Sequence, residues 1–165
     1  MAKEQSFDVV SQVDMQEVVN AVQQASKELT QRYDLKDSGS TIALDRSAAT
    51  ITVTAPSDFV LGQVKDVLAG KLVRRGIDLK ALAWGKIEGA AGGAARTVAH
   101  VVNGIEADLA RRINKEVRDQ KFKVKVQIEG DKLRVFSPSR DALQEVITFL
   151  REQDYGIPLQ FINYR

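Results

Sequence analysis

The positions of hydrophobic residues follow two alternating patterns along the chain. Four segments have apolar side chains at intervals of three and four, a pattern that predicts amphipathic helices: residues 14–33, 57–76, 105–119 and 139–153. Shorter segments are rich in β-branched residues or alternate between apolar and polar ones, which predicts strands: residues 7–13, 42–44, 51–53, 80–87, 95–102, 122–128, 132–136 and 159–164. The mixture of the two patterns predicts an α+β protein.

One part of this pattern occurs twice. Residues 53–57 read Val-Thr-Ala-Pro-Ser, and residues 135–139 read Val-Phe-Ser-Pro-Ser. The same offset places Leu61, Val64 and Leu68 on Leu143, Val146 and Leu150. A strand, a Pro-Ser start and a helix that repeat in register indicate an internal duplication.

Each half therefore reads helix–strand–strand–helix–strand and needs one more strand for the ferredoxin-like βαββαβ plan. That plan has a four-stranded antiparallel sheet with both helices on one face. Residues 80–87 and 95–102 are joined by a glycine-rich loop and should pair with each other. Residues 95–102 then complete the first sheet, and residues 7–13 complete the second. We expect a first domain at 14–102 and a second at 1–13 plus 103–165, with the N-terminal strands exchanged.

The composition excludes several kinds of chemistry. Without cysteine, the chain has no disulfide, thiolate metal site or cysteine nucleophile. The one histidine, His100, cannot form a metal cluster, and the glycines fit neither a phosphate loop nor a dinucleotide fingerprint. We therefore expect no enzyme, no catalytic residue, no metal and no cofactor. The polar N-terminus and the lack of long apolar runs lead us to expect a cytoplasmic protein without a membrane role.

Binding is better supported by the second half of the chain. If helices cover one face of its sheet, the alternating residues of two strands lie together on the other, open face. Five of those seven residues are cationic, which indicates an anionic ligand, and the aromatic one could stack on a base. The residues are Lys121, Lys123, Lys125, Gln127, Lys132, Arg134 and Phe136. A solvated face whose lysines prevent aggregation would have the same composition, and both interpretations stay open.

Five other residues are secondary candidates for ligand binding. Arg74 and Arg75 could hold phosphates, although cations also suit the C-terminus of a helix. Trp84 could stack on a purine or pack inside the protein. Phe161 and Arg165 lie in the last predicted strand, where Phe161 fits a core position equally well.

Five segments of the sequence resemble the YajQ family. They are residues 6–18, 32–34, 74–77, 123–128 and 158–165, and the opening and closing segments are the most specific. The resemblance covers nearly the whole chain. It implies two ferredoxin-like domains with exchanged N-terminal strands, as the loop argument does.

The resemblance also implies a function. It implies a bacterial protein that binds nucleotides, in some members the second messenger cyclic di-GMP, and that regulates through a transcription factor partner. RNA binding is implied as well, because such sheets resemble RNA-recognition domains. Three hypotheses follow: a nucleotide sensor that signals through a protein partner, an RNA-binding module that uses the basic open face, and an adaptor that binds only proteins.

Overall fold

The computed structural model describes residues 3–165, which form two compact units. The continuous unit is the segment Val13–Val102, and the split unit combines Asn103–Arg165 with the residues up to Gln12. Within the described residues there are four α-helices and two antiparallel sheets, so the fold is mixed α and β, as predicted. None of the described helices has the length and apolar character needed to cross a membrane.

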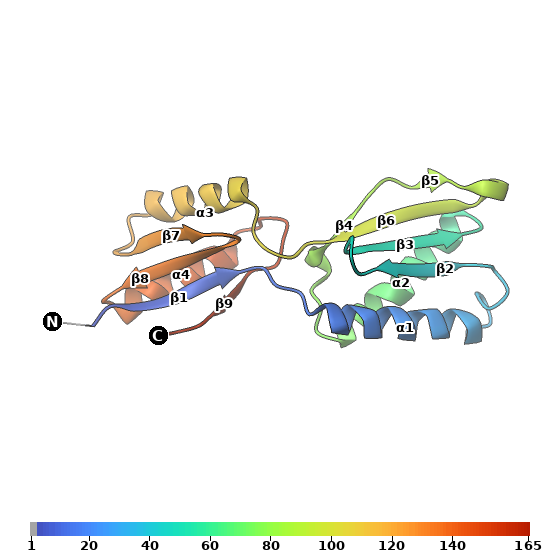
Figure 1. Ribbon diagram of the computed structural model, residues 1–165, viewed down its shortest axis with the longest axis horizontal. Helices are drawn as coiled ribbons and strands as arrows, with labels where there is room; N and C mark the ends of the chain where they lie inside the picture. The colour runs from blue at the N-terminus through green and yellow to red at the C-terminus, as the bar shows by residue number, and fades with distance from the viewer. Residues whose placement is uncertain (1–2) are drawn as a thin grey trace. The chain divides into compact units, whose positions relative to one another are not determined.

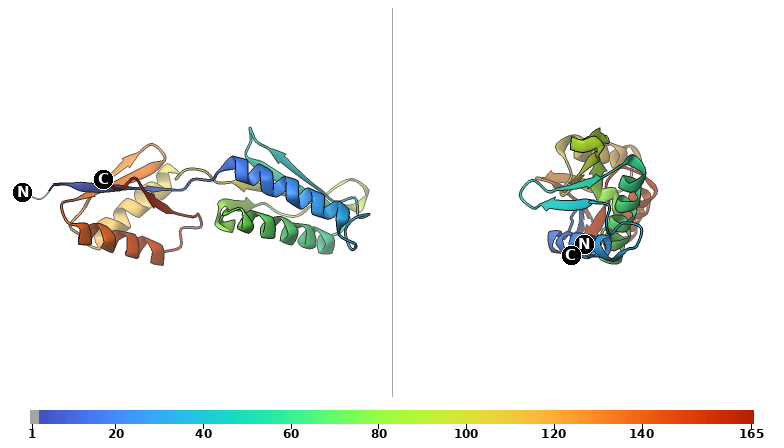
Figure 2. Two further views of the ribbon diagram at one scale, coloured as in Figure 1. Left: turned by 90° about the horizontal axis from the view of Figure 1, so that it is seen from below. Right: turned by 90° about the vertical axis from the view of Figure 1, so that its right-hand side faces the viewer.

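The continuous unit places two long helices against one sheet (Figures 1 and 2). Its elements are α1 (Met15–Gln31), β2 (Thr41–Asp45), β3 (Thr50–Ala55), α2 (Asp58–Arg74), a 3-10 turn (Leu79–Ala81), β4 (Leu82–Trp84), β5 (Glu88–Gly89), a second 3-10 turn (Ala91–Gly93) and β6 (Ala95–Val101). The strand order is β2-β3-β6-β4, and β5 pairs with β6 off this path. Strand β6 thus lies between β3 and β4.

The split unit has the same layers, with its helices on one side of the sheet. Its elements are β1 (Gln5–Val10), α3 (Ala107–Asp119), β7 (Lys125–Glu129), β8 (Lys132–Ser137), α4 (Arg140–Glu152) and β9 (Gln160–Ile162). The strand order is β7-β8-β1-β9. The first strand of the chain therefore lies beside strands that are more than a hundred residues away in the sequence.

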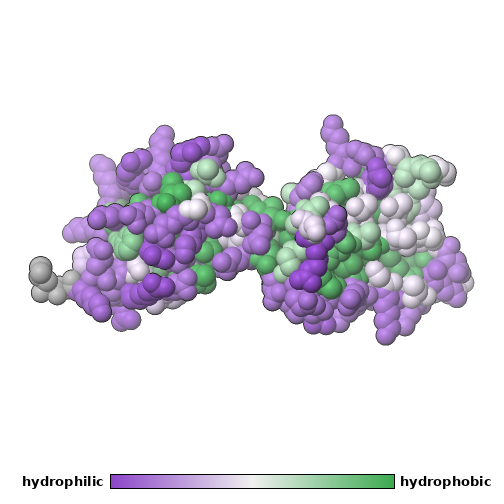
Figure 3. Space-filling model, in the orientation of Figure 1, coloured by the Kyte–Doolittle hydropathy of each residue, from purple (hydrophilic) through white to green (hydrophobic). Residues whose placement is uncertain are grey.

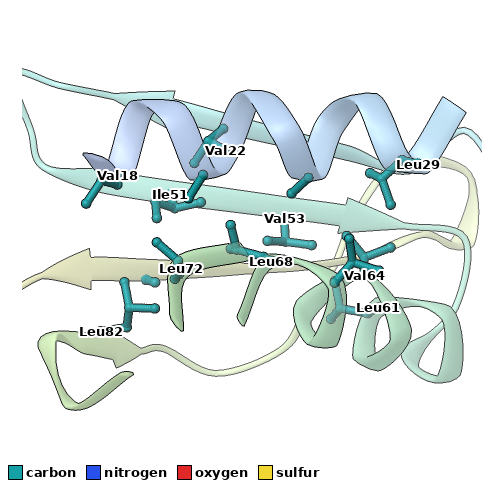
Figure 4. Packing of buried hydrophobic residues seen from close by; sticks show 14 of the residues in the cluster. Val18, Val22, Leu29, Ile51, Val53, Leu61, Val64, Leu68, Leu72 and Leu82 are labelled. Atoms are coloured by element: carbon teal, nitrogen blue, oxygen red, sulfur yellow. The ribbon is translucent and has the colours of Figure 1, made fainter. Parts of the chain in front are cut away.

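Each unit has its own hydrophobic core. In the continuous unit, Val22 of α1 and Leu68 of α2 are buried with Ile51 and Val53 of β3 between the helices and the sheet (Figure 4). In the split unit, Ile113 and Val146 are buried with Phe7, Leu133 and Val135. These apolar residues recur at spacings that place them on one face of each helix or strand. Their burial therefore packs the apolar faces of the helices against the apolar face of the sheet.

Side chains cap the first turns of three of the described helices. The Asp14 side chain accepts the Gln16 backbone N–H at 3.0 Å, and Ser57 and Ser139 accept from Val60 and Ala142 at 3.2 Å. Each contact satisfies one of the backbone donors that a helix leaves free at its first turn. The two serines hold the same place in the repeated Pro-Ser segment.

The bounds of several predicted segments differ from the structure: the strand predicted at 7–13 spans Gln5–Val10, and the one predicted at 159–164 spans Gln160–Ile162. Residues 80–87 form a 3-10 turn and the three-residue strand β4 instead of one long strand. The strand expected from residue 122 begins at Lys125, and Lys121, just after the end of α3, has a left-handed φ of 60°. The helix expected from residue 105 begins at Ala107, and Ile105 instead fills the core.

A close backbone contact lies where the chain enters the split unit for the second time. The Gly104 N–H donates to the Ser11 carbonyl at 2.6 Å, and the Ile105 N–H donates to the Asp131 carbonyl at 2.8 Å. Gly104 has a φ of 98°, and a Cβ atom there would lie 2.7 Å from an Asp131 side-chain oxygen. Only glycine fits this position, which ties the end of β1 to the β7–β8 turn.

Candidate functional site

The open face of the split unit's sheet is built from rows of residues that lie side by side on neighbouring strands. In one row, Lys125 lies opposite Phe136, and Phe136 lies opposite Ser6. Two backbone hydrogen bonds of 3.1 and 3.0 Å join Ser6 to Arg165. Directly opposite residues point to the same face of a sheet. We call this surface the charged face, and its members are Ser6, Asp8, Lys125, Gln127, Glu129, Lys132, Arg134, Phe136 and Ile162.

Asp8 is the centre of the charged face. Its side chain is only 1% exposed, and it accepts hydrogen bonds from three neighbours. Arg134 Nε donates at 2.8 Å, Asn163 Nδ2 at 2.8 Å and Lys132 Nζ at 3.3 Å. A second carboxylate, that of Glu129, lies 3.6 Å from Arg134. The sheet itself therefore supplies counter-ions for two of the cations that the sequence placed on this face.

This network lowers the pKa of Asp8. Burial by itself raises the pKa, because it disfavours the charged carboxylate, but the hydrogen bonds from Arg134, Asn163 and Lys132 favour the charged form and outweigh burial. The pKa of Asp8 falls from 3.8 to about 2. The carboxylate therefore stays ionised at any physiological pH and holds the Arg134 guanidinium in a fixed orientation.

A bulge in the last strand brings Asn163 to this network. Asp8 lies opposite Ile162 while Ser6 pairs with Arg165, so one extra residue is accommodated between them. Asn163 takes up this residue with a left-handed φ of 58°. Bulges of this kind redirect a side chain, and here the Asn163 amide reaches Asp8. Regular alternation along the strand would place Asn163 on the same side as Phe161, and the bulge is the reason that it does not lie there.

The other three predicted cations have no such partner. Lys121, Lys123 and Lys125 are exposed, and none of them forms an ion pair within residues 3–165. They follow one another along the segment that leads into β7, which is an edge strand of its sheet. The predicted basic set thus separates into a neutralised part at Asp8 and a free part at the β7 edge.

Phe136 lies between these two parts. Its ring is half-buried and does not belong to the hydrophobic core of the split unit. Its neighbours across the sheet are the free cation Lys125 and the hydroxyl residue Ser6. An aromatic ring on a sheet surface beside a free cation can stack on a base while the cation meets a phosphate.

A cavity of about 500 Å³ adjoins this row of residues. It is lined by Gln5, Ser6, Arg140, Asp141, Leu143, Gln144, Ile147, Tyr164 and Arg165. Ser6 belongs to both the cavity and the charged face, but Leu143 and Ile147 of α4 also line the cavity, so it lies on the helix side of the sheet and meets the charged face at Ser6. Tyr164 is 62% exposed and packs beside Phe7 with the ring centroids 6.1 Å apart. The cavity therefore adds a second ring and another arginine next to Arg165.

The remaining predicted residues lie elsewhere. Arg74 is exposed near the end of α2, and Arg75 is paired with Glu17 at 3.6 Å. Trp84 is half-buried against the core of the continuous unit, and Lys65 covers its ring at 4.4 Å. Phe161 packs against Phe7 on the core side, with the ring centroids 6.0 Å apart. Arg74, Arg75 and Trp84 belong to the continuous unit, whereas the rest of the predicted set belongs to the split unit.

The sheet of the continuous unit has a quite different open face. Its strands place Thr41, Ala43, Thr50, Thr52, Thr54, Ala83, Arg96, Val98 and His100 there, with Asp45 at one end. We call this surface the threonine face. Figure 3 shows mostly hydrophilic residues over the strands of the split unit and a paler, more neutral surface over those of the continuous unit.

The sequence reasoning missed five residues that shape the site: Ser6, Asp8, Asn163, Arg140 and Tyr164. Asp8 could have been found, because alternation along the first strand places it beside Ser6 on the open face. Asn163 depends on the bulge, which the sequence did not indicate. Among the described residues no cluster of three metal-ligating side chains occurs.

Comparison with known proteins gives full-length relatives. The sequence profile of the family described as nucleotide-binding protein YajQ-like matches residues 5–165. A protein of Desulfitobacterium hafniense named as a nucleotide-binding protein is 50% identical over 165 residues, with 100% of each chain covered. Proteins with the same kind of name from Alkaliphilus oremlandii and Synechococcus elongatus are each 48% identical, again over 100% of each chain.

Proposed function

The chain belongs to the YajQ-like family, and from that premise we propose that it is a nucleotide-binding protein whose ligand lies on the charged face of the split unit. The relatives are named for nucleotide binding, and this chain has a surface suited to it. We propose no catalytic step, because the row that would face the ligand consists of an aromatic ring, a hydroxyl and two cationic side chains.

The observation that carries the proposal is the row Lys125, Phe136, Ser6 and Arg165. Neighbouring strands are about 4.8 Å apart, so the two cations flank the ring with backbones roughly 14 Å from each other. A base stacked on Phe136 would leave its phosphates within reach of a cation at either end. The Ser6 hydroxyl lies between them as a donor or acceptor.

The ligand class we favour is a cyclic dinucleotide of the cyclic di-GMP type. Such a ligand offers two phosphates and two guanines, and arginine recognises both guanine edges and phosphates through paired N–H groups. Asp8 holds Arg134 through Nε at 2.8 Å and Glu129 lies 3.6 Å from its Nη1, which leaves the Nη2 donors for a ligand. The adjoining cavity, with Arg140 and Tyr164, offers a place for the second half of the molecule.

We also propose that each unit is a ferredoxin-like domain in which the N-terminal strands are exchanged. The orders β7-β8-β1-β9 and β2-β3-β6-β4 support this. In both, the strand that precedes the first helix of one unit in the sequence lies in the sheet of the other unit. The proposed domains are 14–102 and 1–13 plus 103–165, which place the whole charged face in the second domain.

RNA binding is the second candidate, and the free lysines favour it. Lys121, Lys123 and Lys125 lie in succession along an exposed edge without carboxylate partners in the described chain. Such a line of cations can follow the phosphates of a single strand while a base stacks on Phe136. This function predicts affinity that falls steeply with salt, with a slope of roughly 0.7 per phosphate contacted.

Because we propose no catalysis, a bound nucleotide must act by changing the affinity for another molecule. We propose a protein partner for this step, of which a transcription factor is the kind that the family resemblance implies. The third hypothesis, a purely protein-binding adaptor, has the same partner but needs no nucleotide.

Isothermal titration of the purified chain tests these alternatives directly. Cyclic di-GMP, GTP and a short single-stranded RNA are titrated in turn at low and high salt. Saturable binding of cyclic di-GMP near one ligand per chain, weakened roughly thirtyfold in Phe136→Ala, is the expected result. RNA binding that is salt-sensitive and lost on Lys123→Ala and Lys125→Ala would favour the second candidate, and no binding of any of the three would favour the adaptor.

A further inference from the structure

A groove of about 560 Å³ runs along α4 on the helix side of the split unit. Its apolar part is formed by Phe122, which precedes β7, and Phe149 of α4. Their ring centroids are 5.8 Å apart in an edge-to-face arrangement, and both rings are only half-buried. The groove therefore presents aromatic surface to solvent at a point where the helix layer leaves the core incompletely covered.

Three carboxylates line the same groove. Asp141, Glu145 and Glu152 lie on one stripe of α4, because positions four and seven apart share a helix face. All three are exposed, and none of them forms an ion pair within residues 3–165. The groove thus combines an apolar floor with an acidic rim whose carboxylates form no ion pair in the described chain, although the free cations Lys121 and Lys123 flank Phe122 in the sequence.

Glu145 and Glu152 are unfavourable for the helix that carries them, whereas Asp141 lies in the first turn, where a carboxylate suits the positive end of the helix dipole. Asp141 and Glu145 are like charges four residues apart, which repel each other. Glu152 is the last residue of α4, where a carboxylate meets the negative end of the helix dipole. Charges that break local helix rules without a compensating contact in the same chain are most often found at functional positions.

We propose that this groove docks a basic segment of a partner protein. The segment is rich in lysine or arginine and carries one aromatic or branched apolar side chain. The apolar side chain packs on Phe122 and Phe149, and the cations meet Asp141, Glu145 and Glu152. The inference rests on the part of the proposed function in which the chain acts through a protein partner, and it needs none of the nucleotide part.

Charge complementarity decides between the possible occupants. Nucleic acids and free nucleotides are anionic, so the three carboxylates repel them from the groove. A second copy of this groove would bring like charges together and is disfavoured for the same reason. A cationic peptide is favoured in two ways. Its charges pair with the carboxylates, which sets specificity, and its apolar side chain buries area against the two aromatic rings.

The groove also lies next to the proposed ligand cavity. Asp141 and Gln144 line both, since they lie on the turn of α4 between the two depressions. A nucleotide that contacts Arg140 therefore binds within one helical turn of the docking groove. This placement gives a short physical route by which ligand and partner could affect each other's affinity.

A displayed library of random dodecapeptides, selected on the intact chain, tests the proposal. The expected selection is for basic peptides with one large apolar residue. A selected peptide is then labelled and titrated by fluorescence anisotropy against the wild type and the charge-reversed double variant Glu145→Lys/Glu152→Lys. We expect affinity to fall at least tenfold in the double variant. The matched control Asp119→Lys, at an exposed end of α3 outside the groove, should stay within twofold of the wild type.

The neutral variants Glu145→Gln and Glu152→Gln separate docking from structure. They should weaken the peptide while leaving the melting temperature equal or higher, since each removes an unfavourable helix charge. Peptides that bind equally well to the double variant, or a selection for acidic peptides, would overturn the proposal. Cyclic di-GMP titrated against the same double variant should bind as to the wild type, so failure of docking and failure of nucleotide binding are distinguished.

Discussion

The two open sheet faces occupy equivalent places in the two units but have different chemistry. The repeat aligns Lys132, Arg134 and Phe136 of β8 with Thr50, Thr52 and Thr54 of β3. The neighbouring strands, β1 beside β8 and β6 beside β3, differ in the same way. Ser6 and Asp8 lie opposite Phe136 and Arg134, whereas Arg96 and Val98 lie opposite Thr54 and Thr52. A buried acid with its cations on one face thus corresponds to valine and threonine on the other.

This difference is the reason that we propose the binding site on the charged face. A fold needs only one apolar face on each sheet, so the open face is free to vary. Small β-branched residues on the threonine face are favourable strand formers and need no ligand to explain them. The charged face instead buries a carboxylate at some cost and leaves Phe136 half-exposed beside a free lysine. The threonine face therefore provides a matched control within the same molecule.

The largest effect is expected from Asp8→Ala. Removal of the carboxylate leaves Arg134 and Lys132 without their main partner at a poorly exposed position. Loss of one member of a buried charge network costs about 3 kcal/mol of unfolding free energy. The equivalent change Val98→Ala should cost about 1 kcal/mol, since Val98 is half-buried and only methyl groups are lost. Amide hydrogen exchange measured by mass spectrometry reports the two units separately, and equal losses would contradict the comparison.

Acid should destabilise the split unit through the same residue. The folded pKa of Asp8 is about 2, against 3.8 for the free side chain. A lowered pKa stabilises the fold in full above about pH 4, and this contribution is lost as the pH falls towards 2. The difference corresponds to roughly 2 kcal/mol of unfolding free energy.

Urea unfolding of the wild type and of Asp8→Asn across this pH range measures the effect. The wild type should lose more stability on acidification than the variant does. Parallel curves for the two proteins would show that Asp8 is not the titrating group.

Phe136→Ala should weaken nucleotide binding by about 2 kcal/mol, or roughly thirtyfold, because stacking on an aromatic ring contributes about 1–3 kcal/mol per base. Thr54→Ala, at the equivalent place on the threonine face, should leave the affinity unchanged. Isothermal titration of both variants gives the two numbers. An effect of similar size at Thr54 would assign binding to the other unit.

The smallest effects are expected at the free lysines. Lys123→Ala and Lys125→Ala should each weaken nucleotide binding by at most about 1 kcal/mol at low salt. The effect should be smaller at high salt, because exposed charges are screened. Lys132→Ala should leave the salt dependence of binding unchanged, since that ammonium is already paired with Asp8 at 3.3 Å. Titration at two salt concentrations shows whether the salt dependence falls only in the variants of the free lysines.

Much of the fold could be predicted from hydrophobic periodicity. The four helices, most of the strands and the repeated Pro-Ser helix start all depend on local sequence, and the structure contains them. The segment around Trp84 could not be predicted, because it is held by contacts with β6 and not by its own alternation. The late start of β7 could not be predicted either, because the segment before it contains a left-handed residue, Lys121, which is not glycine.

The candidate site was predicted only in part, because its chemistry depends on register. Alternation placed the cations and Phe136 on one face, but it could not show that Asp8 lies opposite Arg134 across a separation of more than a hundred residues. The bulge at Asn163 and the position of Tyr164 arise from the same long-range pairing. Local sequence therefore identified the basic face and could not identify which of its charges are already neutralised.

The most direct test of the central claim is a map of amide shifts in the intact chain on addition of cyclic di-GMP. Two-dimensional nitrogen–proton spectra report every backbone amide of both sheets in one titration. The account predicts shifts that centre on Ser6, Lys125, Phe136 and Arg165, with the amides of Thr52, Thr54 and Arg96 unchanged. Shifts centred on the threonine face, or no shifts at saturating nucleotide, would contradict it.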